Sequence, residues 1–238
     1  MNARVRLRLK LYPLLLLPVL IFFSPLLFFG RAFADGDAVV QLYPALKFFH
    51  QSLQSGDSFL WNPHVMSGFP TAASLMGGFF SPLHQWVYRY PDPLLAYAAL
   101  TAVAYGLLAV FSLELVLALG LPASAAFFVG LVLPWVSPHA TWAANFTMTG
   151  AFFLVPAWWL LVVIVATSRS WVVRGAAVAV GGVLGGRVLL TAHWQLLVQA
   201  VMATLAWAAA VAWRERRAAR VTVMAGFLAM VAVAIGLG

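Results

Sequence analysis

The stretch LYPLLLLPVLIFFSPLLFFG, residues 11–30, places twenty uncharged residues between Lys10 and Arg31. An α-helix rises ~1.5 Å per residue and the hydrocarbon core of a bilayer is ~30 Å thick, so about twenty apolar residues cross a membrane once. The stretch therefore predicts a membrane-spanning helix near the start of the chain.

The composition of the whole chain agrees with this interpretation. Its 238 residues are 64% hydrophobic and 8% charged, with a mean hydropathy of +0.96. Soluble domains average ~45–50% apolar and ~25% charged residues, and a domain of this size has too little interior to bury so many apolar side chains. These values exclude a soluble enzyme, a disordered region and a disulfide scaffold, and the absence of cysteine excludes thiolate chemistry.

Further uncharged stretches predict the other crossings. Stretches of 21, 54 and 26 residues follow Asp92, Glu114 and Arg187. The longest must cross more than once, and it contains turn signals at residues 120–122 and 137–139. We expect an all-α integral membrane protein with about seven transmembrane helices and a long, partly helical first outer loop. The expected helices cover residues 11–30, 94–118, 122–137, 147–167, 172–190, 194–213 and 221–238.

This pattern divides the chain into three parts. Residues 1–30 form a basic N-terminus and the first transmembrane helix, residues 31–93 form the first extracytoplasmic loop, and residues 94–238 form six further helices. The last helix reaches Gly238 without a polar tail. We therefore expect this helix to be truncated and the chain to be the N-terminal portion of a longer protein.

The positions of the cations predict the orientation. With the N-terminus in the cytoplasm, ten Lys and Arg residues lie inside and four lie outside, which is the positive-inside pattern. The four outer residues are Arg31, Lys47, Arg89 and Arg187. The pI near 10.6 is thus explained by topology, and we expect no nucleic-acid partner.

A cleaved signal peptide is the alternative to a first transmembrane helix. Residues 32–34 match the A-x-A pattern of a cleavage site. The preceding apolar stretch is longer than the ~7–15 residues of a signal peptide, which favours an uncleaved helix. Residues 31–93 lie outside under either interpretation.

The outer loop is too long to be a plain connector. Its aromatic residues are typical of a membrane interface and unusual in disordered segments; they include Trp61, Phe69, Phe79, Phe80, Trp86 and Tyr88. Apolar residues recur at steps of three and four from Val39 to Leu53. This spacing predicts an amphipathic helix over residues 38–54 that lies along the outer membrane surface.

An ordered set of short motifs carries a resemblance. The motifs are Gly36-Asp37-Ala38-Val39-Val40-Gln41-Leu42-Tyr43-Pro44, then Ser55-Gly56, Trp61-Asn62-Pro63, Gly68-Phe69-Pro70 and Ser81-Pro82. In this order they resemble the first outer loop of YfhO-like bacterial membrane proteins, which belong with the C-type (GT-C) glycosyltransferases. Ala192-His193-Trp194-Gln195 is similar to a Gly-His-Pro-Gln segment of that family, with Ala and Trp in place of Gly and Pro.

The resemblance implies a membrane glycosyltransferase of the bacterial cytoplasmic membrane. Such an enzyme moves a sugar from a polyprenyl-phosphate carrier to a cell-envelope acceptor on the extracytoplasmic face. The resemblance also implies a catalytic aspartate in the first outer loop, at Asp37, with Asp35 as its neighbour.

Asp37 suits two roles. It could take the proton from an acceptor hydroxyl as a general base, or it could cap the helix that follows. The residues alone favour the cap, and the resemblance favours the base. Asp35-Gly36-Asp37 also spells D-x-D, which with His64 or His84 could bind Mg²⁺ or Mn²⁺, although two solvated carboxylates explain the motif better.

Arg187 is the candidate for binding the donor phosphate. Twelve uncharged residues separate it from Arg174, or ~18 Å of helix, so it must lie at or slightly below the outer membrane boundary. An arginine there can form paired hydrogen bonds to phosphate, or it can extend its head to the interface from lipid. His193 and Gln195, just beyond, are further candidates for substrate binding.

Two other features have structural interpretations. Glu114 lies near the cytoplasmic end of the second helix, where pairing with an inner arginine is favoured over a proton relay. The G-x-x-x-G spacings at 181/185 and 182/186 predict close helix packing.

Two other functions fit the crossings. A transporter or flippase for a lipid-linked substrate explains the helices and Arg187, but it leaves the long structured outer loop unexplained. A non-catalytic scaffold of the same fold is the third interpretation.

Overall fold

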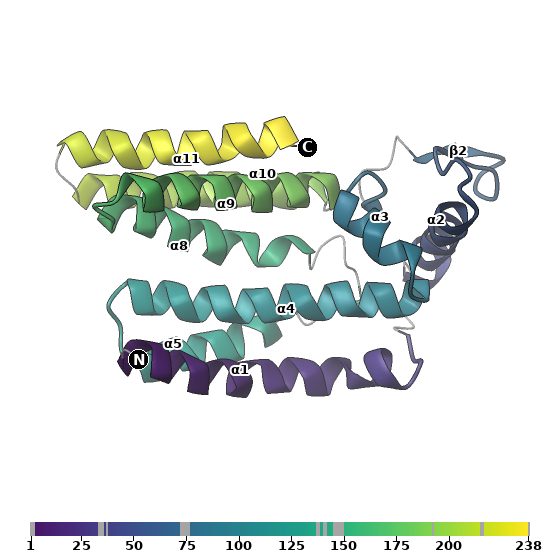
Figure 1. Ribbon diagram of the computed structural model, residues 1–238, viewed down its shortest axis with the longest axis horizontal. Coiled ribbons are helices and arrows are strands. Elements are labelled where there is room, and N and C mark those ends of the chain that lie inside the picture. Colours follow the sequence, from purple (N-terminus) through teal and green to yellow (C-terminus); the bar gives the residue numbers. More distant parts are fainter. Residues whose placement is uncertain are drawn as a thin grey trace.

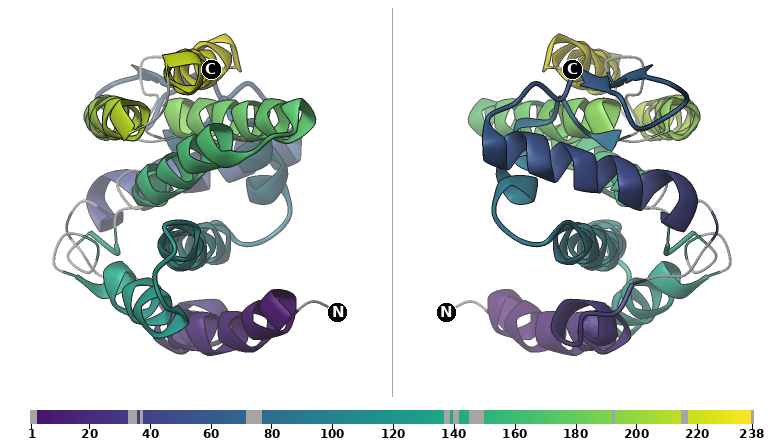
Figure 2. Two further views of the ribbon diagram at one scale, coloured as in Figure 1. Left: turned by 90° about the vertical axis from the view of Figure 1, so that its left-hand side faces the viewer. Right: turned by 90° about the vertical axis from the view of Figure 1, so that its right-hand side faces the viewer.

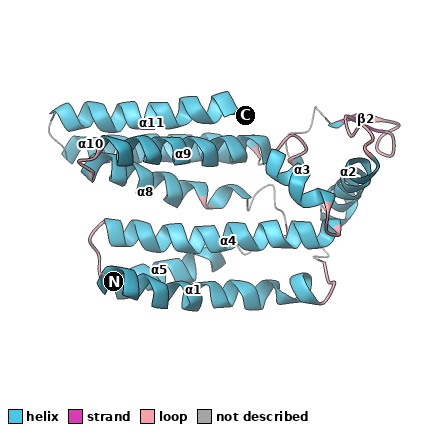
Figure 3. Ribbon diagram, viewed as in Figure 1, coloured by secondary structure: helices cyan, strands magenta, loops and turns pink. Residues whose placement is uncertain are grey.

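A computed structural model describes residues 3–32, 36, 38–71, 77–136, 139, 142–144, 150–191, 193–214 and 217–237. Most of these residues are helical (Figure 3). Within them, six helices are long and apolar enough to cross a membrane, so the expected all-α membrane fold is confirmed. They are α1 (Ala3–Phe28), α4 (Pro93–Ala118), α8 (Leu154–Thr167, with its span from Gly150), α9 (Trp171–Thr191), α10 (Trp194–Arg214) and α11 (Arg217–Leu237).

The helix expected over residues 122–137 falls short of a full crossing. It consists of α5 (Ala123–Val132) and a 3₁₀ turn, η4 (Leu133–Trp135). Thirteen helical residues extend only ~20 Å, less than the ~30 Å of hydrocarbon. The α-helical part ends at Val132 and tightens into the 3₁₀ turn that contains Pro134.

The long helices form two groups (Figures 1 and 2). Helices α1, α4 and α5 lie on one side and α8 to α11 on the other, and the packing of α4 against α8 joins them. The largest apolar core lies around Trp158, which is fully buried. The indole Nε1 of Trp158 donates a hydrogen bond of 2.8 Å to the carbonyl of Gly181, which links α8 to α9.

The glycines of α9 allow α11 to approach closely. A Cβ at Gly182 would lie 2.3 Å from Val233, and a Cβ at Gly185 would lie 2.6 Å from the Trp158 ring and 2.8 Å from Ala234. No larger residue fits between the helices at these positions. The close packing expected from the G-x-x-x-G spacings is therefore confirmed.

Residues of the first loop fold into a small unit beyond one end of the bundle (Figure 1), called the outer unit below. It contains a π-helix, η1 (Ala38–Leu42), then α2 (Tyr43–Ser55), β1 (Trp61–Asn62), β2 (Phe69–Pro70) and α3 (Pro82–Arg89). The two strands pair antiparallel. Gly68, between them, has φ of +118°, and a Cβ there would lie 2.3 Å from the Trp61 indole, so the hairpin requires glycine.

The amphipathic helix expected over residues 38–54 is confirmed, but the expected partner of its apolar stripe is corrected. Leu46 and Phe49 of α2 are buried in a cluster with Phe79 and Tyr88 and with the start of α4. Protein covers the stripe from Leu46 to Leu53, whereas Val39 at its start is exposed. Phe79 and Tyr88 are accordingly core residues and not interfacial rings.

Capping residues fix the ends of the helices around this unit. The Oδ1 of Asp92 accepts hydrogen bonds from the backbone of Leu94 and Leu95, at 2.8 and 3.4 Å, and starts α4. The hydroxyl of Ser81 caps α3 in the same way. Helix α4 ends before Gly120, whose φ of +80° reverses the chain as the sequence predicted.

The basic residues separate between the two ends of the bundle. One end carries the first turns of α1 and the α8–α9 and α10–α11 connections, and the other end carries the outer unit (Figure 1). Described basic residues at the first end are Arg4, Arg6, Arg8, Lys10, Arg169, Arg174, Arg214, Arg217 and Arg220. Those at the second end are Arg31, Lys47, Arg89 and Arg187. The two groups are those that the sequence separated.

Candidate functional site

Arg187 lies in α9, one turn before that helix ends, on the side of the bundle that carries the outer unit. The hydroxyl of Thr191 donates to its backbone carbonyl at 2.9 Å. The guanidinium carbon of Arg187 lies 5.7 Å from the centre of the Phe153 ring. The side chain is thus partly buried and its charge rests on an aromatic face.

Among the described carboxylates, none pairs with Arg187. Glu114 pairs with Arg8, Asp57 accepts a hydrogen bond from Ser55, and Asp92 caps α4. A buried cation normally has an acidic partner, because removing a charge from water is costly. Arg187 is therefore the strongest candidate for binding an anionic ligand.

His84 of α3 is the second component of the site. Its side chain is 1% exposed. The pKa of His84 is lowered from 6.5 to about 3, first by burial and then by the positive charge of Arg187, while a hydrogen bond with the Gly77 backbone partly opposes both effects. His84 is thus a neutral imidazole within range of the charge of Arg187 on α9.

Gly78 holds the His84 ring in place. Its φ is +68°, and a Cβ at this position would lie 1.9 Å from Nδ1 of His84. Any other residue would displace the imidazole. The loop before α3 therefore determines where the histidine lies relative to Arg187.

The structure does not bring the other two predicted substrate-binding residues onto Arg187. The backbone carbonyl of His193 accepts a hydrogen bond of 3.0 Å from the backbone N–H of Leu196 at the start of α10. The side chain of Gln195 is exposed. The Nδ1 of His193 is buried, with no hydrogen-bond partner in the described part of the chain. Neither residue hydrogen-bonds to Arg187 there.

The predicted catalytic residues Asp35 and Asp37 lie outside the described residues. The two histidines considered with them as metal ligands occupy different surroundings. His64 is exposed, with its ring 6.0 Å from that of Phe48, whereas His84 is buried. The described ranges contain no cluster of three residues able to hold a metal ion.

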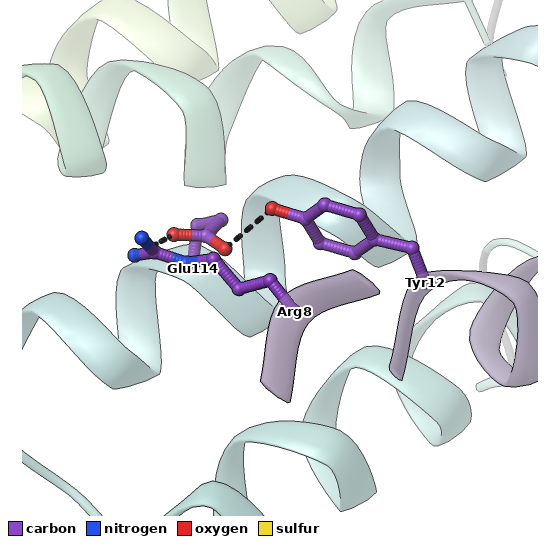
Figure 4. Close-up of polar contacts among 3 residues, drawn as sticks. All are labelled: Arg8, Tyr12 and Glu114. Carbon is purple, nitrogen blue, oxygen red and sulfur yellow. Dashed lines mark hydrogen bonds and ion pairs between the residues drawn. The ribbon is translucent and has the colours of Figure 1, made fainter. Parts of the chain in front are cut away.

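At the opposite end of the bundle, Glu114 accepts two hydrogen bonds (Figure 4). One oxygen accepts from the guanidinium of Arg8 at 2.6 Å, and the other accepts from the hydroxyl of Tyr12 at 2.7 Å. The expected pairing with an inner arginine is confirmed. Both carboxylate oxygens are occupied, which makes this cluster a joint between α1 and α4.

The sequence did not reveal that His84 and Phe153 lie beside Arg187. His84 belongs to α3, Phe153 directly precedes α8, and Arg187 belongs to α9. No local sequence pattern links these three positions. One signal was available for His84. After the Ser81-Pro82 helix start, His84 and Tyr88 are four residues apart and share a face, and that face is the buried one.

Comparison with known protein families, with curated proteins and with solved structures finds no match to this chain. Helix length and hydropathy define its class. It is a multi-pass membrane protein with a small folded unit at one end of its bundle.

Proposed function

We propose that this protein is a YfhO-like, C-type glycosyltransferase that moves a sugar from a polyprenyl-phosphate carrier to a cell-envelope acceptor. The observation that carries the proposal is the partly buried Arg187, beside neutral His84 and unpaired with any described carboxylate. A guanidinium in these surroundings suits the phosphate of a lipid-linked donor, to which it can form two parallel hydrogen bonds. The resemblance of the outer loop supports the same activity.

The reaction assigns one task to each group. The acceptor hydroxyl attacks the anomeric carbon of the sugar from the face opposite the phosphate, so the configuration inverts. Asp37, with Asp35 beside it, takes the hydroxyl proton as general base. The bond between the sugar and the phosphate oxygen breaks, and Arg187 stabilises the charge on the departing polyprenyl phosphate. His193 and Gln195 are further contacts for the donor, and a divalent cation, if bound, would add positive charge near the aspartates.

The proposal includes an orientation. The end with more basic residues faces the cytoplasm, and the outer unit lies on the extracytoplasmic face of a bacterial cytoplasmic membrane. A polyprenyl-phosphate donor is held in the membrane, so its phosphate lies near the lipid boundary. Arg187 is near the end of its spanning helix and is suited to meet a phosphate at that depth.

The test uses purified protein in phospholipid vesicles with a radiolabelled polyprenyl-phosphate sugar. Wild-type protein should release polyprenyl phosphate, Asp37→Asn should abolish release, and Arg187→Gln should reduce it strongly. Arg31→Gln, at an exposed arginine of the same end, is the matched control and should keep activity. Full activity of Asp37→Asn would contradict the proposal, and movement of intact labelled lipid between leaflets without release would favour a flippase.

A further inference from the structure

The connection between α10 and α11, at the end of the bundle away from the outer unit, carries a concentrated positive charge (Figure 1). Residues 214–220 contain four arginines and one glutamate, a net charge of +3. In the described part of this segment, Arg214 and Arg220 are exposed. Trp213, the last residue but one of α10, is 80% exposed. This end of the bundle thus presents a large aromatic ring together with exposed cations.

Contacts between Trp213 and Arg220 hold the ring and one of the cations together. The guanidinium carbon of Arg220 lies 5.9 Å from the centre of the Trp213 ring, and its Nη2 donates a hydrogen bond of 3.3 Å to the Trp213 carbonyl. These contacts link the end of α10 to the first turn of α11. The cation–π contact and the hydrogen bond restrict a long side chain, so the charge of Arg220 is fixed beside the ring.

The length of α10 places these residues at a membrane boundary. A second exposed tryptophan, Trp194 at 67%, begins the same helix. Trp213 follows it after ~28 Å of helix, which nearly matches the ~30 Å thickness of the hydrocarbon core. Exposed tryptophan is typical of the level at which lipid headgroups meet water. The two rings therefore mark the two boundaries, and Arg214 and Arg220 lie at the headgroup level beside Trp213.

The neighbour at this level is lipid, and the charge of the connection selects its headgroup. A polybasic segment directly beyond a spanning helix attracts anionic phospholipids, whereas a zwitterionic headgroup brings its own cation. Arginine also forms paired hydrogen bonds to phosphate oxygens. The start of α10 provides the contrast, because no charged residue adjoins Trp194 in the sequence. The end of α10 therefore combines an interfacial ring with the cations that an anionic headgroup requires.

We propose that Trp213, Arg214 and Arg220 bind the headgroup of an anionic phospholipid in the leaflet at the end of the bundle away from the outer unit. The two arginines contact the phosphate, and the Trp213 ring packs against the glycerol and the first acyl carbons. This lipid site lies at the opposite end of the bundle from Arg187. It is independent of the proposed glycosyltransferase activity, and it stands if that function fails.

Native mass spectrometry of the full chain in detergent, titrated with phosphatidylglycerol or phosphatidylcholine, tests the charge selectivity. Wild type should bind phosphatidylglycerol about 30-fold more tightly, or ~2 kcal/mol for two arginines, and Arg214→Gln/Arg220→Gln should remove this preference. Arg31→Gln/Arg89→Gln neutralises two exposed arginines at the opposite end and, as the matched control, should keep the preference. Equal binding of both lipids by wild type, an unchanged preference in the first variant or an equal loss in both variants would overturn the proposal. A second copy or a nucleic acid bound in place of lipid, and lost only in the first variant, would also overturn it.

Fluorescence quenching locates the bound lipid. The chain has no cysteine, so Val221→Cys and Ile235→Cys each offer one labelling site, and both side chains are 66% exposed near opposite ends of α11. The vesicles contain equal amounts of phosphatidylglycerol and phosphatidylcholine, with one of the two lipids brominated. A fluorophore at residue 221, next to Arg220, should be quenched more strongly by the brominated anionic lipid, and a fluorophore at residue 235 should be quenched equally by both. Arg214→Gln/Arg220→Gln should abolish the difference at residue 221. Equal quenching by the two lipids at residue 221 of the otherwise wild-type chain, or the same preference at residue 235, would overturn the site.

Discussion

Arg8 and Arg187 lie in spanning helices at opposite ends of the bundle, and their surroundings differ. Arg8 forms an ion pair of 2.6 Å with Glu114, whose second oxygen is bound by Tyr12. Arg187 rests on the Phe153 ring beside the neutral His84 and pairs with none of the described carboxylates. The first cluster satisfies its own charges, and in the second the described residues provide no carboxylate for the guanidinium.

This difference separates a structural role from a binding role. A charge within a membrane is costly, so it remains in a protein where a partner neutralises it or where a ligand needs it. Arg8 meets the first condition through Glu114, and we expect its loss to weaken the fold. Under the proposed function Arg187 meets the second condition, and we expect its loss to weaken ligand binding.

The largest expected effect is that of Glu114→Ala on stability. The change leaves Arg8 without its partner and Tyr12 without its acceptor, and we expect a loss of about 2–3 kcal/mol of unfolding free energy. The value is below the ~3–5 kcal/mol of a fully buried pair because Arg8 is 39% exposed. Chemical unfolding in detergent micelles measures it. The double variant Arg8→Met/Glu114→Met should be close to wild type, and a loss by that variant as large as that of Glu114→Ala would contradict the explanation.

Arg187→Met should have the opposite pattern. We expect the affinity for polyprenyl phosphate in detergent micelles to fall about 30-fold, equivalent to ~2 kcal/mol of charge-assisted hydrogen bonds. Its unfolding free energy should be equal to or above that of wild type, because a costly buried charge is removed. Calorimetric titration and chemical unfolding measure the two quantities, with Arg31→Gln as the control. Loss of stability without loss of affinity would place Arg187 in the same structural role as Arg8.

Acid should weaken the fold through His84. The unfolded chain binds a proton at this residue near pH 6.5, but the folded chain does so only near its lowered pKa of about 3. Below pH 6.5 the unfolded state therefore gains protons that the folded state excludes, and stability falls by up to ~1.4 kcal/mol per pH unit. His84→Gln should remove this contribution, and Arg187→Met should reduce it because a repelling charge is lost.

Unfolding measurements between pH 7 and pH 5 compare these variants with His64→Gln. His64 is exposed, so this control should keep the acid sensitivity of wild type. An unchanged slope in His84→Gln would show that acid acts through other groups.

Tyr12→Phe should have the smallest effect. It removes one hydrogen bond to Glu114 but leaves the ion pair with Arg8, so we expect a loss of about 1 kcal/mol. Chemical unfolding measures it, and Tyr90→Phe, at a tyrosine that is 69% exposed, should be neutral. A loss as large as that of Glu114→Ala would mean that Tyr12 and not Arg8 is the main partner of the carboxylate.

The long helices could be predicted from the sequence, because local properties decide them. Uncharged stretches indicated the six spans, and the Gly120 turn and the glycines of α9 had the expected roles. The pairing of Glu114 followed from its depth in α4. The helix expected over residues 122–137 was counted as a crossing, but α5 and η4 together are too short to span the hydrocarbon, which apolar composition alone did not reveal.

The partners of the apolar and polar side chains were harder to predict. The period of α2 indicated one apolar face, but it did not distinguish a lipid surface from the Phe79 and Tyr88 rings that cover it. The position of Arg187 near the outer boundary was predicted, whereas the approach of His84 was not. Their proximity depends on how α3 packs against α2 and α4, which no local spacing encodes.

The sequence by itself determined that the chain spans a membrane several times, which ends of its helices share a side, and where its cations lie. Each residue's charge and hydropathy determine on its own how it interacts with the bilayer, so these properties can be predicted without knowing the tertiary structure. Only the tertiary structure decided that Arg8 pairs with Glu114, while Arg187 lies over the Phe153 ring and its charge reaches His84. The cost of a buried charge depends on neighbours that are distant in the chain, and those neighbours exist only once the helices have packed.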